Sequence, residues 1–215
     1  MIIHEQEITW AQHTLILTNK KAIYWPAQKT LILSDLHLGK AAHFRRNGIP
    51  IPSQIHQRDL DVLEKLLLHY TVDKVIVVGD LIHAHQNGEV LDFKNFLQQF
   101  SEIEFILIKG NHDRIADRKI LDFGVKAVCN TFHLDGIEFV HEPEKCADYQ
   151  ISGHIHPGVT VRLPTNKHFR LPSYVVSENM IILPAFSQFT GLDTKQSFEK
   201  SVNYAILDTG IMAIK

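Results

Sequence analysis

The stretch TLILSDLH, residues 30–37, joins a run of apolar side chains to a carboxylate and an imidazole two positions apart. A continuous apolar run is typical of a strand that is buried on both faces of a sheet. The arrangement recurs twice, because the expected strand Lys74–Val78 leads into Gly79-Asp80, and Glu104–Ile108 leads into the sequence GNHD at residues 110–113. These segments predict three strands with polar side chains at their ends.

Two expected helices separate these strands. Apolar residues follow helical spacing over residues 54–70, where Ser53 suits the N-cap position, and again over residues 89–100. The alternation of strands with helices predicts parallel pairing and right-handed crossovers.

The second half of the chain is richer in strands. Residues 125–132 and 137–141 flank Asp135-Gly136, which is a hairpin turn signal, and a second hairpin is expected over residues 204–214. Shorter strands are expected at residues 13–17, 21–24, 149–152, 159–163, 173–176 and 180–183. We therefore expect one α/β domain over residues 1–215, in which two packed sheets carry helices on the outside.

The composition limits the classes of protein that the chain can be. It has 215 residues, 45% of them hydrophobic, and a net charge of −2, so no global basic field indicates nucleic acid. Cys129 and Cys146 form no CxxC spacing, and we expect both to be reduced thiols. No apolar segment approaches the roughly 18 residues of a membrane helix, and we expect no signal peptide because residues 1–10 lack a basic stretch followed by an apolar run. We expect a cytoplasmic protein that does not enter a membrane.

Polar residues that follow the expected strands form a candidate metal site. Ligands bind at the carboxyl ends of the strands in open α/β sheets, so residues far apart in sequence should meet there. Carboxylate and amide oxygens with imidazole nitrogens suit Mn²⁺, Fe²⁺ or Zn²⁺. The D-x-H and H-x-H spacings would place two side chains on one side of an extended segment. The set consists of Asp35, His37, Asp80, Asn111, His112, Asp113, His141, His154 and His156.

Each member of this set is a weak signal alone. An aspartate after a strand can cap a helix, and a single histidine is more often a core or surface residue than a ligand. The ordered combination D-x-H, G-D, G-N-H-D, H and G-H-x-H would be very rare by chance, so the combination predicts a metal site.

The ordered set resembles that of the calcineurin-like metallophosphoesterases. Further segments resemble one bacterial branch of them, the ligase-associated metallophosphoesterases, also described as DNA-damage-response endonucleases. These segments are SDLHLGKAAHFR (residues 34–45), GIPIP (48–52), HEP (141–143), SGHIHPGV (152–159) and LPAFSQFTG (183–191). The resemblance implies a two-sheet β-sandwich flanked by helices, in α/β/β/α layers.

The resemblance also implies a role for each site residue. Asp35, His37 and His156 would bind one metal ion, Asn111, His141 and His154 would bind a second, and Asp80 would bridge them. Mn²⁺ is the expected metal, with Fe²⁺ or Zn²⁺ as alternatives. Ions roughly 3.5–4 Å apart would share a water and convert it to the hydroxide that attacks phosphorus. His112 would stabilise the transition state and protonate the leaving oxygen. Asp113 would either orient His112 or cap the next segment.

Substrate contacts are expected from the segments beside the ligands. Arg45 and Arg46 follow the first motif, where they could contact a substrate phosphate or form a solvated charged loop. His83 could support a ligand, face the substrate or lie on the surface. Phe186 and Phe189 are expected in the core, with base stacking as the alternative. Arg162, Lys167, His168 and Arg170 form a mildly basic stretch that could follow a nucleic-acid backbone or be solvated.

Three functions remain open from the sequence. The leading one is a two-metal phosphodiesterase or nuclease that acts on DNA in bacterial repair. The branch then implies an ATP-dependent DNA ligase, a helicase and an exonuclease as neighbours in the same operon. The first alternative is a phosphoesterase or pyrophosphatase that acts on a small nucleotide or a nucleotide-lipid conjugate. The second is a non-catalytic protein-binding scaffold, which would be expected to lack some ligands, whereas every ligand position is filled here.

Overall fold

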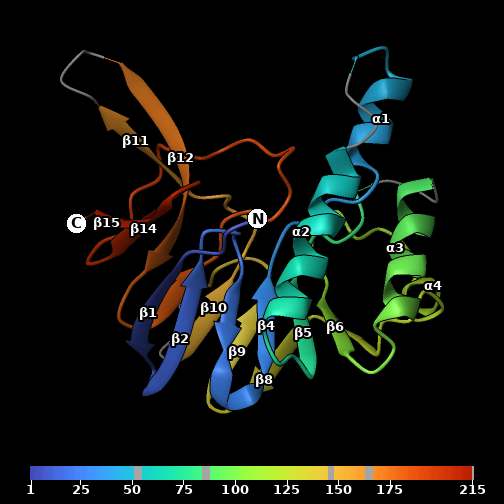
Figure 1. Ribbon diagram of the computed structural model, residues 1–215, viewed down its shortest axis with the longest axis horizontal. Helices are drawn as coiled ribbons and strands as arrows, with labels where there is room; N and C mark the ends of the chain where they lie inside the picture. Colours follow the sequence, from blue (N-terminus) through green and yellow to red (C-terminus); the bar gives the residue numbers. More distant parts are fainter. Residues whose placement is uncertain (51–54, 84–87, 145–147, 163–166, 215) are drawn as a thin grey trace.

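Two sheets pack face to face, and helices cover the outer face of the first sheet (Figure 1). The computed structural model describes residues 1–50, 55–83, 88–144, 148–162 and 167–214, and excludes the side chains of Arg46, Ile55 and His56. The expected two-sheet α/β sandwich with flanking helices is confirmed.

The first sheet has seven strands in the order β1-β2-β3-β4-β5-β6-β7. Neighbours from β1 to β4 pair antiparallel, and neighbours from β4 to β7 pair parallel. Helix α2 connects β4 to β5 and helix α3 connects β5 to β6, as the alternation predicts. The bounds are β1 Glu5–Trp10, β2 His13–Thr18, β3 Ile23–Trp25, β4 Thr30–Leu33, β5 Lys74–Val78, β6 Glu104–Ile108, β7 Ala127–Cys129, α2 Ile55–His69 and α3 Gly88–Gln99.

The second sheet has the order β15-β14-β12-β13-β10-β9-β8, and β11 pairs with β12 outside this path. Its centre is parallel where β10 pairs with β9 and β13, and its other pairs are antiparallel. The bounds are β8 Thr131–Leu134, β9 Ile137–Val140, β10 Tyr149–Ser152, β11 Gly158–Arg162, β12 His168–Val176, β13 Met180–Ile182, β14 Val202–Leu207 and β15 Gly210–Ile214.

Alternation along each buried strand divides the core into two layers. In β4, Leu31 and Leu33 pack against the helices, whereas Ile32 between them packs against the second sheet. Successive strand side chains point to opposite faces, so a continuous apolar run supplies both layers at once. The helix layer includes Leu63 of α2 and Phe93 of α3, both about 1% exposed.

The structure differs from the prediction at several places. Strand β1, helix α1 (Lys40–Arg46) and the short helix α4 (Asp117–Leu121) were not expected, and β12 begins at His168 instead of the expected residue 173. The single strand expected at residues 125–132 is two strands, because β7 joins the first sheet beside β6 while β8 joins the second sheet beside β9. The chain crosses between the sheets at Asn130, which periodicity in one strand could not reveal.

The cysteines and the lengths of the helices can be compared with the expectations from composition. Cys129 is a free thiol, whereas Cys146 and the expected N-cap Ser53 lie outside the described residues. Among the helices described, none has both the length and the apolar character needed to cross a bilayer.

Candidate metal centre

The candidate ligands meet where β4, β5, β6, β9 and β10 end. The loops after β4 and β5 are joined by the backbone N–H of His37, which donates to the carbonyl of Asp80 at 2.8 Å. A hydrogen bond also joins the two sheets, because the backbone N–H of His154 donates to Oδ2 of Asp35 at 3.2 Å. The strand ends of both sheets therefore converge on one site, as expected for this topology.

One group of ligands contains Asp35, His37 and His156. The Nε2 atoms of the two histidines lie 3.3 Å apart, and Nε2 of His156 lies 3.1 Å from Oδ1 of Asp35. One ligand atom from each residue lies within 4.8 Å of the others. Asp35 and His37 are buried, and the His156 side chain is 18% exposed. This is the set that the resemblance assigns to one metal ion.

The second group surrounds the imidazole of His141. Its Nε2 lies 3.3 Å from Oδ1 of Asn111, 3.2 Å from Nδ1 of His154 and 3.5 Å from Oδ1 of Asp80. The other carboxylate oxygen of Asp80 lies 3.9 Å from Nε2 of His37, in the first group. The Asp80 carboxylate therefore extends from one group to the other.

Asp35 also lies between the groups. The ligand atoms of Asp35, Asp80 and His141 come within 4.8 Å of one another, just as those of Asp35, His37 and His156 do. The sequence pattern singled out only Asp80 as a bridge, because nothing in the sequence shows how close Asp35 lies to His141.

His141 and His37 are held in the form that binds metals. Nδ1 of His141 lies 3.2 Å from the carbonyl oxygen of Val78, which can only accept, so Nδ1 carries the proton and Nε2 keeps a lone pair. Burial, and then the charge of Lys40, lower the pKa of His37 to about 2. His37 is therefore a neutral imidazole at neutral pH.

The ligand side chains are aimed by an unusual backbone conformation. Asp35 and His37 have φ values of 55° and 51°, in the left-handed region, so the expected extended segment with side chains on one side is wrong. Such conformations cost on the order of 1–3 kcal/mol each and cluster at functional sites. The same region holds Asp80 at 49°, His154 at 67° and His156 at 53°.

Two glycines leave room for the ligands. Gly79 has a φ of 84°, and a Cβ added there would overlap the imidazole of His141. A Cβ added at Gly110 would overlap the carboxylate of Asp80. Larger residues would therefore displace a candidate ligand, which explains the glycine before Asp80 and the glycine before Asn111.

The donor set suits a divalent cation. Among the described residues, the buried Nδ1 of His37 has no hydrogen-bond partner, and the buried Oδ1 of Asp35 has only its contact with Nε2 of His156. Imidazole nitrogens 3.2–3.3 Å apart beside two buried carboxylates are an arrangement that a positive ion would stabilise. The residues present therefore fit the metal chemistry that the sequence predicts.

His112 and His83 form a pair of rings at the edge of the site. The backbone N–H of His112 donates to Oδ1 of Asp80 at 2.9 Å, and its side chain is 37% exposed. Its ring centroid lies 4.5 Å from that of His83 and 5.6 Å from that of His37. Burial, followed by the charges of His112 and Lys40, lowers the pKa of His83 to about 4. The structure thus places His83 beside His112, at the site and not on a remote surface.

Asp113 has a different place from either one expected. Its carboxylate accepts the backbone N–H groups of Ile82 at 2.7 Å, Gly110 at 2.9 Å and Leu81 at 3.3 Å. The structure records no hydrogen bond from this carboxylate to the His112 side chain, and the N-cap of α4 is Ala116. Asp113 therefore fastens the loop after β5 to the loop after β6, which positions the segments of both motifs.

Arg45 is engaged in an ion pair behind the site. Its Nη2 donates to Oε1 of Glu89 on α3 at 3.0 Å, and the Glu89 side chain is 4% exposed. The other oxygen of Glu89 accepts the backbone N–H of Gly39, two residues after His37. This geometry gives Arg45 a structural role, and its contact with substrate stays a prediction. The side chain of Arg46 lies outside the described residues.

Sequence reasoning missed two buried carboxylates that hold the loops of the site. Glu89 is one. Asp59 on α2 is the other, 3% exposed, and it accepts the backbone N–H of Gln188 at 3.2 Å. The sequence carries a signal for both residues. Glu89 lies four residues before Phe93, and Asp59 lies four residues before Leu63, so each acid shares the buried face of its helix.

The LPAFSQFTG segment lies against the first motif. The backbone N–H of Phe186 donates to the carbonyl of Ser34 at 2.8 Å, and the Phe186 side chain is buried in the core as expected. Phe189 is half-buried, and its ring lies 5.5 Å from that of Phe44 on α1. This segment therefore supports α1 and the strand end that carries Asp35.

Comparisons with known proteins agree with this geometry. A family model described as calcineurin-like phosphoesterase matches residues 28–143. The crystal structure of Pseudomonas putida nuclease MPE is similar, with a TM-score of 0.82 and 28% identity over 98% of this chain and 100% of that chain. Protein AQ665 of Aquifex aeolicus, of unknown function, has 20% identity and a TM-score of 0.43 over 59% of this chain and 78% of that chain. No curated protein matches the chain.

The family match spans more than half of the chain and includes the motifs of Asp35, Asp80, Asn111 and His141. The side chains of Asp35, Asp80 and His141 from these motifs lie close enough together to hold a metal ion. The chain therefore belongs to the calcineurin-like phosphoesterase family and is a metal-dependent hydrolase of phosphoric esters.

Proposed function

We propose that the protein is a two-metal phosphodiesterase that cleaves DNA, with its activity in bacterial DNA repair. The observation that carries this proposal is the convergence of two ligand groups with the carboxylates of Asp35 and Asp80 between them. The similarity over 98% of the chain to a Pseudomonas putida nuclease supports a polynucleotide substrate.

The two groups of side chains would hold two divalent ions. Asp35, His37 and His156 would bind one ion. Asn111, His141 and His154 would bind the other, and Asp80 would contact both. When bound, such a pair lowers the pKa of the attacking water and neutralises the charge that develops on the phosphoryl oxygens. The donor set suits Mn²⁺, with Fe²⁺ or Zn²⁺ as alternatives.

His112 would act on the substrate. Its backbone N–H holds the Asp80 carboxylate, and its half-exposed imidazole lies at the rim of the ligand groups. From this position the ring can donate a proton or hydrogen bond to the leaving oxygen. The ring of His83 lies 4.5 Å from that of His112, and burial lowers the pKa of His83 to about 4, so His83 is neutral at neutral pH.

A comparison of substrates tests this proposal. The protein is supplied with Mn²⁺ and assayed on single-stranded and duplex DNA, an aryl phosphodiester, an aryl phosphomonoester and a nucleoside diphosphate derivative. We expect cleavage of DNA and of the diester, with much slower hydrolysis of the monoester. Rapid hydrolysis of the small nucleotide without DNA cleavage would instead favour the alternative of a nucleotide phosphoesterase.

A further inference from the structure

The strands β11 and β12 form a two-stranded ribbon that projects from the body of the sandwich (Figure 1). Residues 158–162 pair antiparallel with residues 168–172, while only residues 173–176 of β12 pair with the second sheet. The exposed residues toward the tip include Arg162, His168, Phe169 and Arg170. Exposed two-stranded ribbons are weakly stable by themselves, so this one calls for an explanation.

The pairing register separates the ribbon into a basic face and an apolar face. Arg162 is paired with His168, and Thr160 with Arg170, so these four side chains lie on one face. The intervening pairs, Val161 with Phe169 and Val159 with Leu171, lie on the other face. We call the first the basic face, defined by Arg162, His168 and Arg170.

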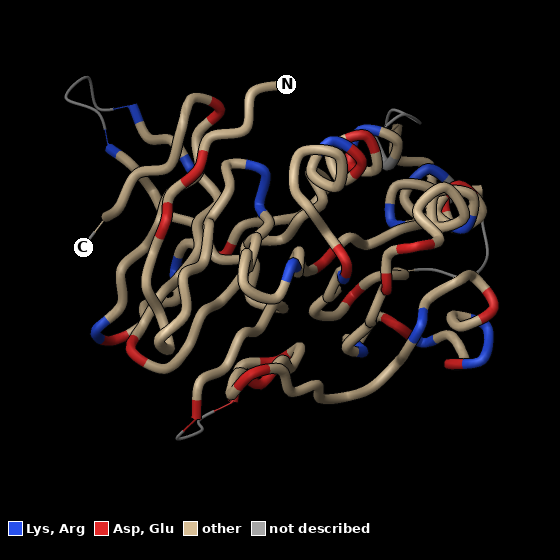
Figure 2. Tube along the Cα trace, turned by 60° about the horizontal axis from the view of Figure 1, so that its bottom comes forward, with Lys and Arg blue, Asp and Glu red and all other residues tan. Residues whose placement is uncertain are grey.

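The ribbon is positive in a protein that is negative overall. Residues 149–177 contain Arg162, Lys167 and Arg170 but no aspartate or glutamate, so the stretch has a net charge of +3, whereas the whole chain has −2. Figure 2 shows Lys and Arg on the described part of the ribbon, with no Asp or Glu among them. The local field therefore attracts a polyanion although the global charge does not.

The ribbon begins at the metal centre. Gly158, its first residue, follows His156 by two positions, and the carbonyl of His156 accepts the backbone N–H of Asp193 at 3.0 Å. The carbonyl of Asp193 in turn accepts the N–H of Gly158 at 2.8 Å. At about 3.4 Å per strand residue, Arg162 lies about 20 Å along the ribbon from His156. A substrate must be several nucleotides long to reach it.

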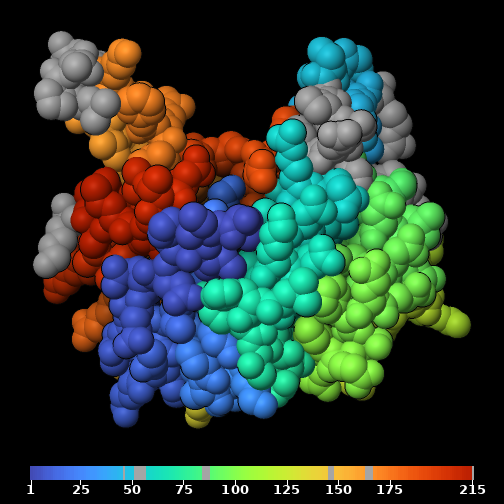
Figure 3. All heavy atoms as spheres, in the orientation of Figure 1, coloured from blue at the N-terminus to red at the C-terminus, as the bar shows by residue number. Residues whose placement is uncertain are grey.

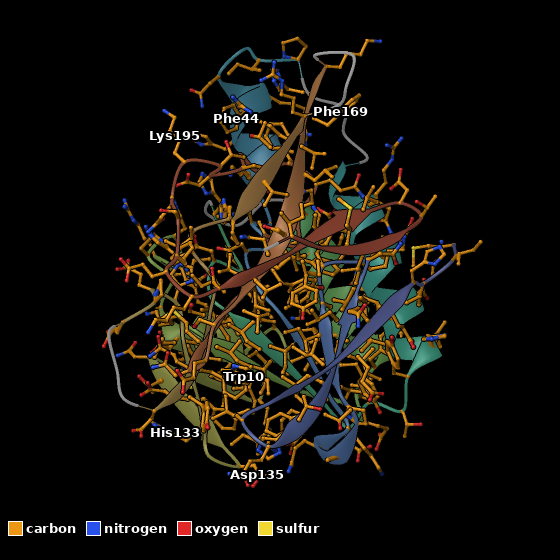
Figure 4. All side chains as sticks on the ribbon, turned by 90° about the vertical axis from the view of Figure 1, so that its left-hand side faces the viewer. Trp10, Phe44, His133, Asp135, Phe169 and Lys195 are labelled. Atoms are coloured by element: carbon orange, nitrogen blue, oxygen red, sulfur yellow. The ribbon has the colours of Figure 1, made fainter. Side chains whose placement is uncertain are left out.

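A second projection begins on the other side of the site. Helix α1 starts at Lys40, three residues after His37, whose Nε2 lies 3.3 Å from that of His156. Figure 3 shows the ribbon and α1 on opposite sides of a notch in the surface. Figure 4 shows Phe44 of α1 and Phe169 of the ribbon near the same end of the molecule. The ligand histidines thus lie at the roots of both projections.

We infer that the basic face binds the phosphate backbone of DNA that extends from the metal centre, and that this contact selects polynucleotides over small phosphodiesters. The inference rests on the proposed nuclease function. Arg162 and Arg170 contact phosphates some nucleotides away from the scissile bond. A small aryl phosphodiester fills only the metal centre and cannot reach them.

The test uses the double variant Arg162→Gln, Arg170→Gln, loaded with Mn²⁺. The matched control is Lys65→Gln, Lys119→Gln, which removes two exposed positive charges from α2 and α4. Phe169→Ala probes the opposite face of the ribbon. Each protein is assayed on a single-stranded 20-mer and on bis(p-nitrophenyl) phosphate, over a range of salt concentrations.

We expect kcat/KM for the 20-mer to be roughly tenfold lower in the arginine variant than in the parent. For the aryl diester, kcat/KM should stay within about twofold of the parent value. The slope of log(kcat/KM) against log[salt] should become shallower by about 1.4, since each phosphate contact with a single strand contributes about 0.7. The lysine control and Phe169→Ala should retain the parent values.

Five outcomes would overturn the inference. Equal losses on both substrates would make the arginines part of the catalytic site or of its folding. If the lysine control lost as much activity on the 20-mer as the arginine variant, the effect would come from the overall charge of the protein and not from the ribbon. A loss in Phe169→Ala alone would move the contact to the apolar face. Parent-like DNA cleavage by the arginine variant would overturn the ribbon inference and leave the nuclease standing, whereas a parent that cleaves only the aryl diester would overturn the nuclease as well.

Discussion

Glu89 and Gly39 are joined by a hydrogen bond of 2.7 Å, in which the backbone N–H of Gly39 donates to the buried carboxylate of Glu89. The same carboxylate pairs with Arg45, so one residue of α3 fastens both the loop after His37 and helix α1. A buried acceptor of this kind costs about 1–3 kcal/mol to lose.

Glu89→Gln should therefore loosen the loop that carries His37. We expect a lower melting temperature of the metal-free protein and a weaker Mn²⁺ affinity, measured by calorimetry. Glu104→Gln is the control, because Glu104 is exposed at the start of β6. If the melting temperature falls while Mn²⁺ affinity does not, Glu89 stabilises the fold without positioning His37.

Gly79→Ala should remove metal binding by displacing a ligand. The added methyl group would overlap the imidazole of His141, and a φ of 84° disfavours alanine in any case. Gly136→Ala separates the two causes, because Gly136 has a φ of 79° with no atom near the added group. Both variants should lose about 1–2 kcal/mol of stability, but only Gly79→Ala should lose bound metal by elemental analysis. Normal metal content in Gly79→Ala would contradict the placement of His141.

Asp80→Asn should weaken both metal sites together. The Asp80 oxygens lie 3.5 Å from Nε2 of His141 and 3.9 Å from Nε2 of His37, so one substitution alters both groups. Titration with Mn²⁺ followed by electron paramagnetic resonance should show weaker binding of every ion and little turnover. A variant that keeps one tight site would show that Asp80 serves a single ion.

His112→Ala should separate chemistry from metal binding. The metal content should stay near that of the parent, while turnover on a substrate with a poor leaving group falls by roughly 10²–10⁴-fold, the range for a positioned acid. The loss should be smaller with an aryl leaving group, which needs little protonation. Equal losses on both leaving groups would show that His112 acts by electrostatic stabilisation instead.

The sequence predicted the parts of the fold that depend on periodicity. The apolar runs at β4, β5 and β6 supply both core layers through simple alternation, and the amphipathic spacing of α2 and α3 matches the face that each helix buries. The crossing of the chain at Asn130 was not predictable in this way, because β7 pairs with β6 of the first sheet whereas β8 forms a hairpin with β9 in the second sheet.

The candidate site was predictable in its composition but not in its geometry. The ordered motifs gave all seven candidate ligands, yet the left-handed backbone at Asp35 and His37 has no signature in residue type. The place of Asp113 depends on backbone groups of another loop, Leu81 and Ile82, which no local pattern shows. Glu89 and Asp59 were detectable, since each carboxylate falls on the buried face of its helix.

Anomalous diffraction from crystals grown with MnCl₂ would locate the metal ions themselves. Two anomalous peaks are expected at the strand ends. One should be bound by Asp35, His37 and His156, and the other by Asn111, His141 and His154, with Asp80 in contact with both. A single peak at full occupancy with excess Mn²⁺, or ions bound by other side chains, would contradict the two-metal account.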